Sequence, residues 1–280
     1  MSLKEKNIIS RHKEIIAAAF DGAAANYGTA GGGFFDYFGS RIAEHADIKA
    51  GNTVLDIACG RGACLFPAQE RAGTTGKLFG IDISAEMIEH IRRDAEHLAL
   101  NNIDLQVMDA EQLNFPDGYF DAALCGFSLF FLPQLDRALA ETFRVLKTGG
   151  RFVTSTFAER DDNWRDVRRL IGSYQKKIEA LPLADTQLLN KAENIKKQFE
   201  RAGFRKIKVF AETKKFYYKD ADEWRQVMWS SACRGFLEMM DEKMLAEFME
   251  ESFKIIQRIK PEKQGIPEKF NVLITKAVKE

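Results

Sequence analysis

From residue 53 onward the chain alternates short apolar runs with longer amphipathic stretches, and this alternation limits its possible folds more than any other feature. The apolar runs are rich in Val, Ile, Leu and Phe, which is typical of strands buried on both faces of a parallel sheet. Helical spacing of apolar residues follows in Ser84–Leu100 and Gln134–Lys147, with Ser84 as a suitable N-cap. Strands are predicted over Thr53–Ala58, Leu78–Ile83, Leu105–Met108, Phe120–Phe127 and Arg151–Phe157. This pattern predicts a doubly wound α/β fold.

After Phe157 the alternation breaks. A polar, mostly helical stretch extends to about Ala202, and a strand is predicted over Lys206–Ala211. Residues 220–260 are predicted to form two or three helices, and Phe270–Val278 a closing strand. Because a long insertion between two strands must lie outside the sheet, we expect it to form a helical lid.

Charge and cysteine content exclude several classes of protein. The chain has 41 basic and 41 acidic side chains, which gives no reason to expect a nucleic-acid partner or an anionic membrane surface. Its four cysteines form no CxxC pair, so neither a metal site nor a disulfide framework is predicted. We see no secretory signal and no apolar run of the roughly 18 residues that a membrane span needs. The expected location is therefore the cytoplasm.

The sharpest local feature is a short strand that runs directly into a turn of small residues, Val54–Gly62. Gly60 and Gly62 allow the backbone to approach a ligand closely, and Ala58 is nearly as permissive. An ordinary tight turn between a strand and a helix would look similar. Asp56 favours a ligand site, because a carboxylate near the end of a buried strand needs a partner.

Acids also accompany the next two predicted strands. Asp82 stands at the end of the second strand, where it could accept hydrogen bonds from ribose hydroxyls or simply stabilise a helix N-terminus. Asp109 follows the third strand. Since the carboxyl ends of parallel strands meet at one edge of a sheet, we expect Asp56, Asp82 and Asp109 to align along that edge.

Five segments in this order resemble the class I S-adenosylmethionine-dependent methyltransferases, in particular the small-molecule group that includes the ubiquinone and menaquinone biosynthesis C-methyltransferases. The segments are LDIACGRG, GIDIS, MDAEQL, FPDGYFD and FRVLKTGG. The chain departs from the family pattern at Ala58, where the family has glycine, and at Thr148, where it has proline. Neither change blocks binding, since alanine is small and Thr148 only loosens a turn.

The resemblance implies S-adenosylmethionine as the cofactor and a role for each matching residue. The turn and Asp56 would line the methionine moiety, Asp82 would hold the ribose hydroxyls, and residues after the second and third strands would meet the adenine. Residues at the end of the fourth strand would approach the amino-acid end and the methyl group. The predicted cofactor-binding residues are Tyr27, Asp56, Ala58, Gly60, Gly62, Asp82, Ile83, Met87, Asp109, Ala110, Glu111, Cys125 and Phe127.

The same resemblance implies a Rossmann-like, seven-stranded sheet whose last strand is antiparallel. We predict a helical arm over the active site in residues 1–50, and a core in residues 51–280 with helical insertions at about 159–190 and 213–266. Tyr27 belongs to a segment similar to the family's arm. If a general base exists, His12 in that arm is the candidate. A nicotinamide-binding fingerprint is absent, because position 65 is Leu65 rather than glycine.

Methyl transfer is an in-line displacement, and the thioether that leaves is neutral, so alignment contributes more than proton transfer. Aromatic residues around the expected acceptor pocket favour a small apolar or planar metabolite. Two alternatives stay open, a peptide-modifying methyltransferase and a cofactor-binding, non-catalytic partner subunit. The sequence leaves open a homodimer, the identity of the acceptor and the atom that is methylated.

Overall fold

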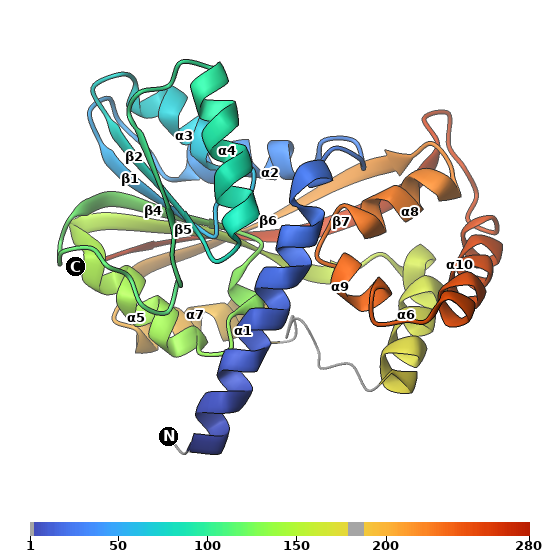
Figure 1. The fold of residues 1–280 in the computed structure, drawn as a ribbon. Helices are drawn as coiled ribbons and strands as arrows, with labels where there is room; N and C mark the ends of the chain where they lie inside the picture. The colour runs from blue at the N-terminus through green and yellow to red at the C-terminus, as the bar shows by residue number, and fades with distance from the viewer. Residues whose placement is uncertain (1–2, 179–187) are drawn as a thin grey trace. The chain divides into compact units, whose positions relative to one another are not determined.

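The computed structural model describes residues 3–178 and 188–280, which include a seven-stranded sheet of order β3-β2-β1-β4-β5-β7-β6 (Figure 1). Its strands are β1 (Thr53–Ile57), β2 (Lys77–Asp82), β3 (Ile103–Val107), β4 (Phe120–Gly126), β5 (Leu146–Arg160), β6 (Arg205–Tyr218) and β7 (Ile266–Val278). The first five pair in parallel. Chain direction reverses at β7, because the backbone N–H of Gly149 donates to the Lys279 carbonyl and that of Lys279 donates to the Gly150 carbonyl. The predicted fold class is confirmed.

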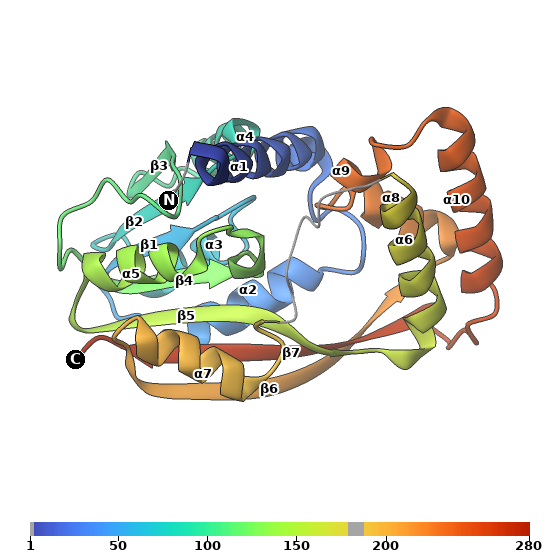
Figure 2. The ribbon, with the colours of Figure 1, turned by 90° about the horizontal axis from the view of Figure 1, so that it is seen from below.

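The described helices are labelled in Figure 2. They are α1 (Leu3–Ala23), α2 (Phe34–His45), α3 (Leu65–Ala72), α4 (Ala85–His97), α5 (Leu135–Val145), α6 (Arg165–Lys177), α7 (Ala192–Arg201), α8 (Ala221–Trp229), α9 (Arg234–Leu237) and α10 (Glu242–Ile256). Short 3-10 turns, η1 (Ala24–Asn26), η2 (Leu129–Phe131) and η3 (Asp162–Trp164), join some of them. None of the described helices is both long and apolar enough to cross a membrane.

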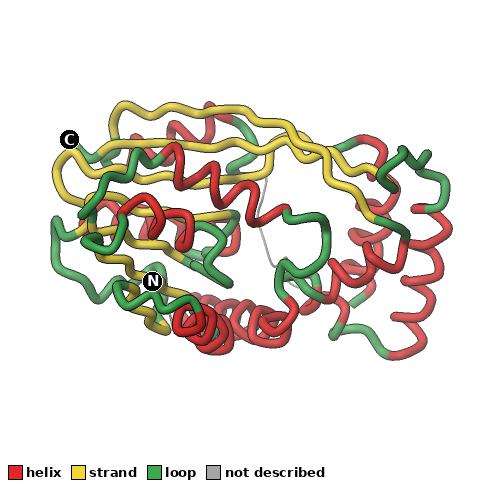
Figure 3. Tube along the Cα trace, turned by 90° about the horizontal axis from the view of Figure 1, so that it is seen from above, coloured by secondary structure: helices red, strands yellow, loops and turns green. Residues whose placement is uncertain are grey.

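The chain divides into two compact units, which we describe separately. The sheet unit comprises Phe35–Ala158, Ala184–Glu212 and Val272–Glu280. The helical unit comprises Met1–Phe34, Glu159–Leu183 and Thr213–Asn271. Helices α1, α6, α8, α9 and α10 therefore belong to the helical unit, and the loops and helices of both units can be followed in Figure 3.

In the sheet unit, α5 and α7 cover one face of the sheet and α2 and α3 the other (Figures 1 and 2). Leu139 of α5 and Phe199 of α7 pack onto the strands beside Leu55 and Phe152. The stacked rings of Phe152 and Phe199 have centroids 5.5 Å apart. This continuous apolar packing explains why the central strands read as unbroken apolar runs.

Three strands are longer than the sequence predicts. Helix α5 ends at Val145 and β5 begins at Leu146, whereas the prediction continued the helix to Lys147. The correction has a physical cause, because Leu146 already pairs with Phe120 of β4 and Gly149 pairs with Lys279. Strand β6 likewise continues past Ala211 to Tyr218, and β7 begins at Ile266 rather than Phe270.

The helical unit has its own core, formed largely by aromatic side chains that the sequence analysis assigned to a lid. Trp164, Trp224 and Phe236 are 2%, 4% and 3% exposed. Helix α1 packs on α9 so closely that a Cβ on Gly22 would lie 2.8 Å from the Arg234 Nε. These rings therefore stabilise the unit itself. The predicted placement of residues 1–50 over the active site stays a prediction.

Candidate functional site

The turn after β1 has an unusual backbone. Ala58, Gly60 and Gly62 all have positive φ angles, of 53°, 50° and 82°. Glycine adopts this left-handed region freely, but for alanine it costs about 1–2 kcal/mol. The Cys59 N–H donates to the Ile81 carbonyl at 2.9 Å, which ties the turn to β2. A strained non-glycine residue held in this way is typical of functional sites.

Close packing also fixes the last glycine of the turn. A Cβ on Gly62 would lie 2.7 Å from both the Ile91 Cδ1 and the Phe66 Cε2 atoms. Next to it, the Arg61 guanidinium pairs with Asp94 of α4 at 2.6 Å, a contact that the sequence analysis did not find. The turn is therefore held by β2, α3 and α4 together.

Asp56 lies within β1 and is 1% exposed. Neither of its carboxylate oxygens has a hydrogen-bond partner among the described residues. Burial raises the pKa of Asp56 well above its usual value, the nearby Asp82 carboxylate raises it further, and the Leu65 N–H offsets this only in part. A buried acid without a donor is costly, so the arrangement favours a ligand with a donor or a positive charge.

The strand registers place the three acids on a diagonal. Asp56 is in register with Gly80 of β2, and Gly80 is two residues before Asp82. Asp82 is in register with Val107 of β3, and Val107 is two residues before Asp109. Because side chains alternate with a period of two, this step keeps Asp56 and Asp82 on one face of the sheet. The structure thus brings the three acids to the edge formed by the carboxyl ends of the strands. Each acid lies two residues further along its strand direction than the acid before it.

Asp82 also holds the turn after β1 in place through hydrogen bonds. Its Oδ2 accepts from the Gly60 N–H and its Oδ1 accepts from the Ser84 N–H, each at 2.9 Å. Ser84 caps α4 by accepting from the Met87 N–H at 3.1 Å. Ile83 is half-buried, whereas the Met87 side chain is fully buried.

The segment after β3 is stabilised by its own side chains. Asp109 is half-buried and accepts from the Glu111 N–H at 2.9 Å. Ala110 and Glu111 are buried. The Glu111 carboxylate accepts from both the backbone N–H and the side-chain amide of Gln134, at 2.7 and 2.9 Å. Glu111 therefore anchors the start of α5.

The end of β4 repeats the strain found after β1. Phe127 has a φ of 52° and its N–H donates to the Ser155 hydroxyl at 3.1 Å. Ser155 was missed by the sequence analysis, although a polar Thr-Ser-Thr run in an otherwise apolar strand could have indicated it. Cys125 is fully buried with its Sγ 2.8 Å from the Ser128 hydroxyl oxygen, and burial raises the pKa of its thiol to about 12.

His12 and Tyr27 belong to the helical unit. His12 lies on α1 and is half-buried. Tyr27 follows η1, and its ring centroid is 5.9 Å from that of Phe20. Their roles as base and as cofactor contact stay predictions.

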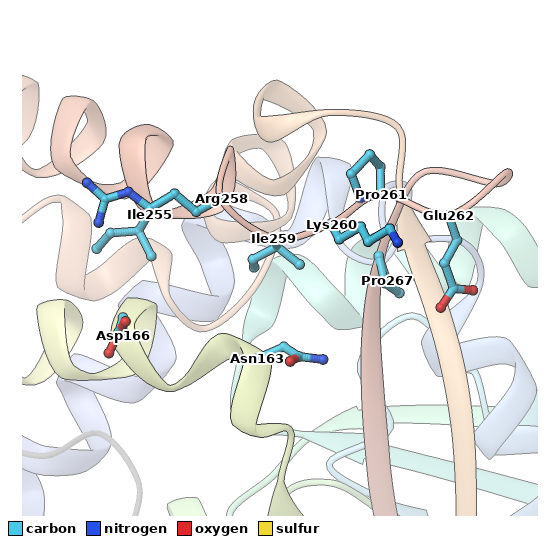
Figure 4. Close-up of a pocket in the computed structure, with 9 residues that line it drawn as sticks. All are labelled: Asn163, Asp166, Ile255, Arg258, Ile259, Lys260, Pro261, Glu262 and Pro267. Carbon is cyan, nitrogen blue, oxygen red and sulfur yellow. The ribbon is translucent and has the colours of Figure 1, made fainter.

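A separate hollow of about 650 Å³ lies in the helical unit between α6, the end of α10 and the start of β7 (Figure 4). Arg258 and Lys260 line it, but their charged ends point in opposite directions (Figure 4). A binding site needs polar groups that converge on one ligand, and this hollow has none. No group of three or more potential metal ligands occurs in the described part of the chain.

The strand order reverses between β1 and β4, and ligands of open α/β sheets bind outside the carboxyl ends of the strands at such a point. Both the strained turn and Phe127 lie there. Fold and site together define a nucleoside-binding α/β protein. The residues fit S-adenosylmethionine, since its positive charge would partner the buried Asp56.

The comparisons agree with this class. Residues 54–150 match a family model described as a methyltransferase domain. Over 142 residues the chain is 44% identical to the aklanonic acid methyltransferase DauC of Streptomyces sp. (strain C5). This match covers 51% of this chain and 64% of DauC. It is 30% identical over 191 residues to the ubiquinone/menaquinone biosynthesis C-methyltransferase UbiE of Pseudomonas putida (strain GB-1). This match covers 66% of this chain and 73% of UbiE. The chain belongs to the class I S-adenosylmethionine-dependent methyltransferases.

Solved structures show the same fold. The YcgJ protein of Bacillus subtilis matches with a TM-score of 0.60 at 20% identity, covering 87% of this chain and 99% of that one. The matched segments of the chain span 64% of DauC and 47% of the nocamycin O-methyltransferase of Saccharothrix syringae, less than two thirds of either relative.

Proposed function

We propose that this protein transfers a methyl group from S-adenosylmethionine to a small apolar or aromatic metabolite. The observation that carries the proposal is the buried, unpartnered carboxylate of Asp56 beside the strained turn, at the point where strand order reverses. S-adenosylmethionine supplies an activated methyl group on a positively charged sulfur. Relatives named for aklanonic acid, nocamycin and demethylmenaquinone support a small-molecule acceptor.

Each part of the site has a role in this proposal. Asp56, Ala58, Gly60 and Gly62 hold the methionine moiety. The Asp82 carboxylate accepts from the ribose hydroxyls. The adenine is contacted by residues after β2 and β3, and the amino-acid end by residues after β4. The adenine contacts are Ile83, Met87, Asp109, Ala110 and Glu111, and those after β4 are Cys125 and Phe127.

An aromatic cluster in the sheet unit supports an apolar acceptor. The Phe127 ring lies 4.8 Å from Phe157, 5.6 Å from Phe38 and 6.4 Å from Phe35, between ring centroids. These rings converge on the carboxyl ends of β4 and β5. Aromatic faces next to a sulfonium attract it by about 0.5–2 kcal/mol, and they also offer a planar acceptor a surface to stack on.

Partners and location follow from charge and thiols. A net charge of zero supports the absence of a nucleic-acid partner. Cys59, Cys64, Cys125 and Cys233 are free thiols, which supports the reducing cytoplasm as the location. Light scattering of the purified chain would decide between monomer and homodimer.

Calorimetric titration with S-adenosylmethionine tests the cofactor. We expect saturable binding with one site per chain, and an absence of binding at millimolar ligand would overturn the proposal. Release of S-adenosylhomocysteine with a panel of phenols, quinols and amines then tests turnover. Binding without turnover on any small molecule or peptide would favour a non-catalytic partner subunit, and turnover on peptides alone would favour a peptide-modifying enzyme.

A further inference from the structure

The helical unit holds a cluster of ionisable side chains that the proposed methyl-transfer site does not use. Strands β5, β7 and β6 are neighbours, and within this unit they carry Arg160, Glu268 and Tyr218. The Tyr218 hydroxyl donates to the Glu268 Oε2 at 2.6 Å. Glu268 therefore stands on the middle strand, with an arginine on one neighbouring strand and its hydrogen-bond donor on the other.

The backbone on both sides of Glu268 is anchored. The Trp164 Nε1–H donates to the Pro267 carbonyl at 2.9 Å. The Lys269 N–H donates to the Asp161 carboxylate at 2.8 Å. Because Asp161 and Trp164 both belong to the segment around η3, that segment fixes the backbone from which the Glu268 side chain projects.

Aromatic rings pack against the Tyr218 end of the pair. Tyr218 is 5% exposed, and the Trp164 ring packs edge-on against it with centroids 5.3 Å apart. Trp224 in turn stacks on Trp164, with centroids 6.5 Å apart. The Tyr218 hydroxyl donates to the Glu268 carboxylate, whose residue is half-buried. Partial burial beside these rings disfavours a charge on that carboxylate.

Charged groups reach the pair from every element packed around it. Arg160 comes from β5, Arg168 from α6, Asp161 from the residue before η3, and Cys233 from the residue before α9. Burial raises the pKa of Glu268 to about 7, against the opposing effects of the Tyr218 hydroxyl and the two arginines, while the Asp161 carboxylate adds to the rise. Burial also lowers the pKa of Arg160.

We propose that Glu268 and Tyr218 form a proton-operated switch inside the helical unit. With a proton on Glu268 the pair is neutral and the three strand segments pack closely around Trp164. When the proton leaves to water, a half-buried carboxylate stays beside aromatic rings, and the packing around Trp164 and Tyr218 loosens. This inference does not depend on the proposed methyl transfer.

The direction of the pH effect follows from linkage. The pKa of Glu268 is higher in the folded chain than the usual glutamate value of about 4.3 in the unfolded chain. Its contribution to stability is therefore fully present below about pH 4.3 and is lost as the pH rises through about 7.

Tryptophan fluorescence tests the switch in the full chain. The three tryptophans, Trp164, Trp224 and Trp229, all belong to the helical unit, so emission reports on this unit alone. Between pH 5 and 9 we expect one reversible step with a midpoint near 7, which means a proton bound roughly 500-fold more tightly than by an ordinary glutamate. Glu268→Gln should remove the step. Tyr218→Phe should move it to higher pH, because it removes the donor that favours the charged form.

Two control variants separate this step from other titrations. Glu262→Gln changes an exposed acid of the same unit that pairs with Lys215, and His12→Gln removes the unit's histidine on α1. Both should keep the step. If the wild-type protein shows no step near pH 7, or if Glu268→Gln retains it, the switch does not exist.

Nuclear magnetic resonance provides a second readout in case Glu268→Gln folds poorly. The side-chain carboxyl carbon of Glu268 in the wild-type chain, labelled with carbon-13 at glutamate, should titrate with a midpoint near 7. A midpoint near 4.5 would overturn the proposal regardless of how the variant behaves.

Discussion

Ala58 and Phe127 leave two neighbouring parallel strands, β1 and β4, through the same left-handed backbone conformation, with φ angles of 53° and 52°. Neither residue adopts this conformation without cost. A hydrogen bond holds each turn in place. The Cys59 N–H, next to Ala58, donates to the Ile81 carbonyl, and the Phe127 N–H donates to the Ser155 hydroxyl. Two strained residues thus stand where the proposed cofactor and acceptor meet, which is the relationship expected of a preorganised site.

The substitution Ala58→Gly should stabilise the protein. Relief of the left-handed strain exceeds the entropy that glycine adds to the unfolded chain, so we expect a gain of about 0.5–1 kcal/mol in the free energy of unfolding. Ala99→Gly is the matched control, because Ala99 has a φ of 54° in an exposed turn. Both variants should raise the melting temperature, and binding of S-adenosylmethionine should stay within a few-fold of wild type. A lower melting temperature for Ala58→Gly alone would contradict the argument from strain.

The substitution Gly62→Ala should destabilise the protein more than Gly73→Ala. Both glycines have positive φ, but a Cβ on Gly73 meets nothing within 4 Å, whereas one on Gly62 meets Ile91 and Phe66 at 2.7 Å. We expect about 1–2 kcal/mol for Gly73→Ala and a further 1–3 kcal/mol for Gly62→Ala. Urea denaturation of the two variants measures the difference. Equal losses would show that the turn is not closely packed.

The substitution Asp56→Asn should stabilise the protein but weaken its binding of S-adenosylmethionine. Because burial raises the pKa of Asp56, its stabilising contribution is present at low pH and is lost as the pH rises. The uncharged variant should therefore be about 1–2 kcal/mol more stable than wild type at pH 8 without cofactor. Its affinity for S-adenosylmethionine should fall at least about tenfold, because a charge-assisted contact is lost. Asp104→Asn, at an exposed acid of β3, should change neither quantity.

His45 should make the protein sensitive to acid. Its ring stacks on Phe210 at 4.4 Å, and its Nε2 is buried without a partner among the described residues. Burial lowers the pKa of His45, and the charge of Arg41 lowers it further. The unfolded chain therefore takes up this proton first, and stability falls as the pH drops below about 6.5.

The substitution His45→Leu should remove that part of the acid loss, seen as a flatter dependence of the melting temperature on pH between 7 and 5. His97→Gln changes an exposed histidine and should leave the dependence as in wild type. A wild-type slope in His45→Leu would mean that this ring does not titrate differently on unfolding.

Most of the candidate site could be predicted from local sequence patterns. The turn after β1 could be identified because its small residues and Asp56 follow one another within a few positions. The edge position of Asp82 and Asp109 followed from strand order alone. What the sequence could not show was how hydrogen bonds are distributed, for instance that the Glu111 carboxylate is used by Gln134, 23 residues away.

Long-range pairing limited the prediction of the fold in a similar way. The predicted helix continued to Lys147, but β5 begins at Leu146, and Gly149 and Gly150 pair there with Lys279, which is far away in the sequence. Trp164 and Trp224 fill a second core whose segments come from three separate stretches of sequence. No local periodicity distinguishes a ring that faces a ligand from one that faces another helix.

The position of β7 between β5 and β6 has a consequence for synthesis on the ribosome. Strand β6 is made before β7, yet its neighbour in the sheet is β7, so β6 has no partner strand until β7 has left the exit tunnel. Until β7 has been made, the nascent sheet therefore has an open edge at β5, and the thirteen-residue strand β7 then covers that edge and supplies the pairing surface for β6.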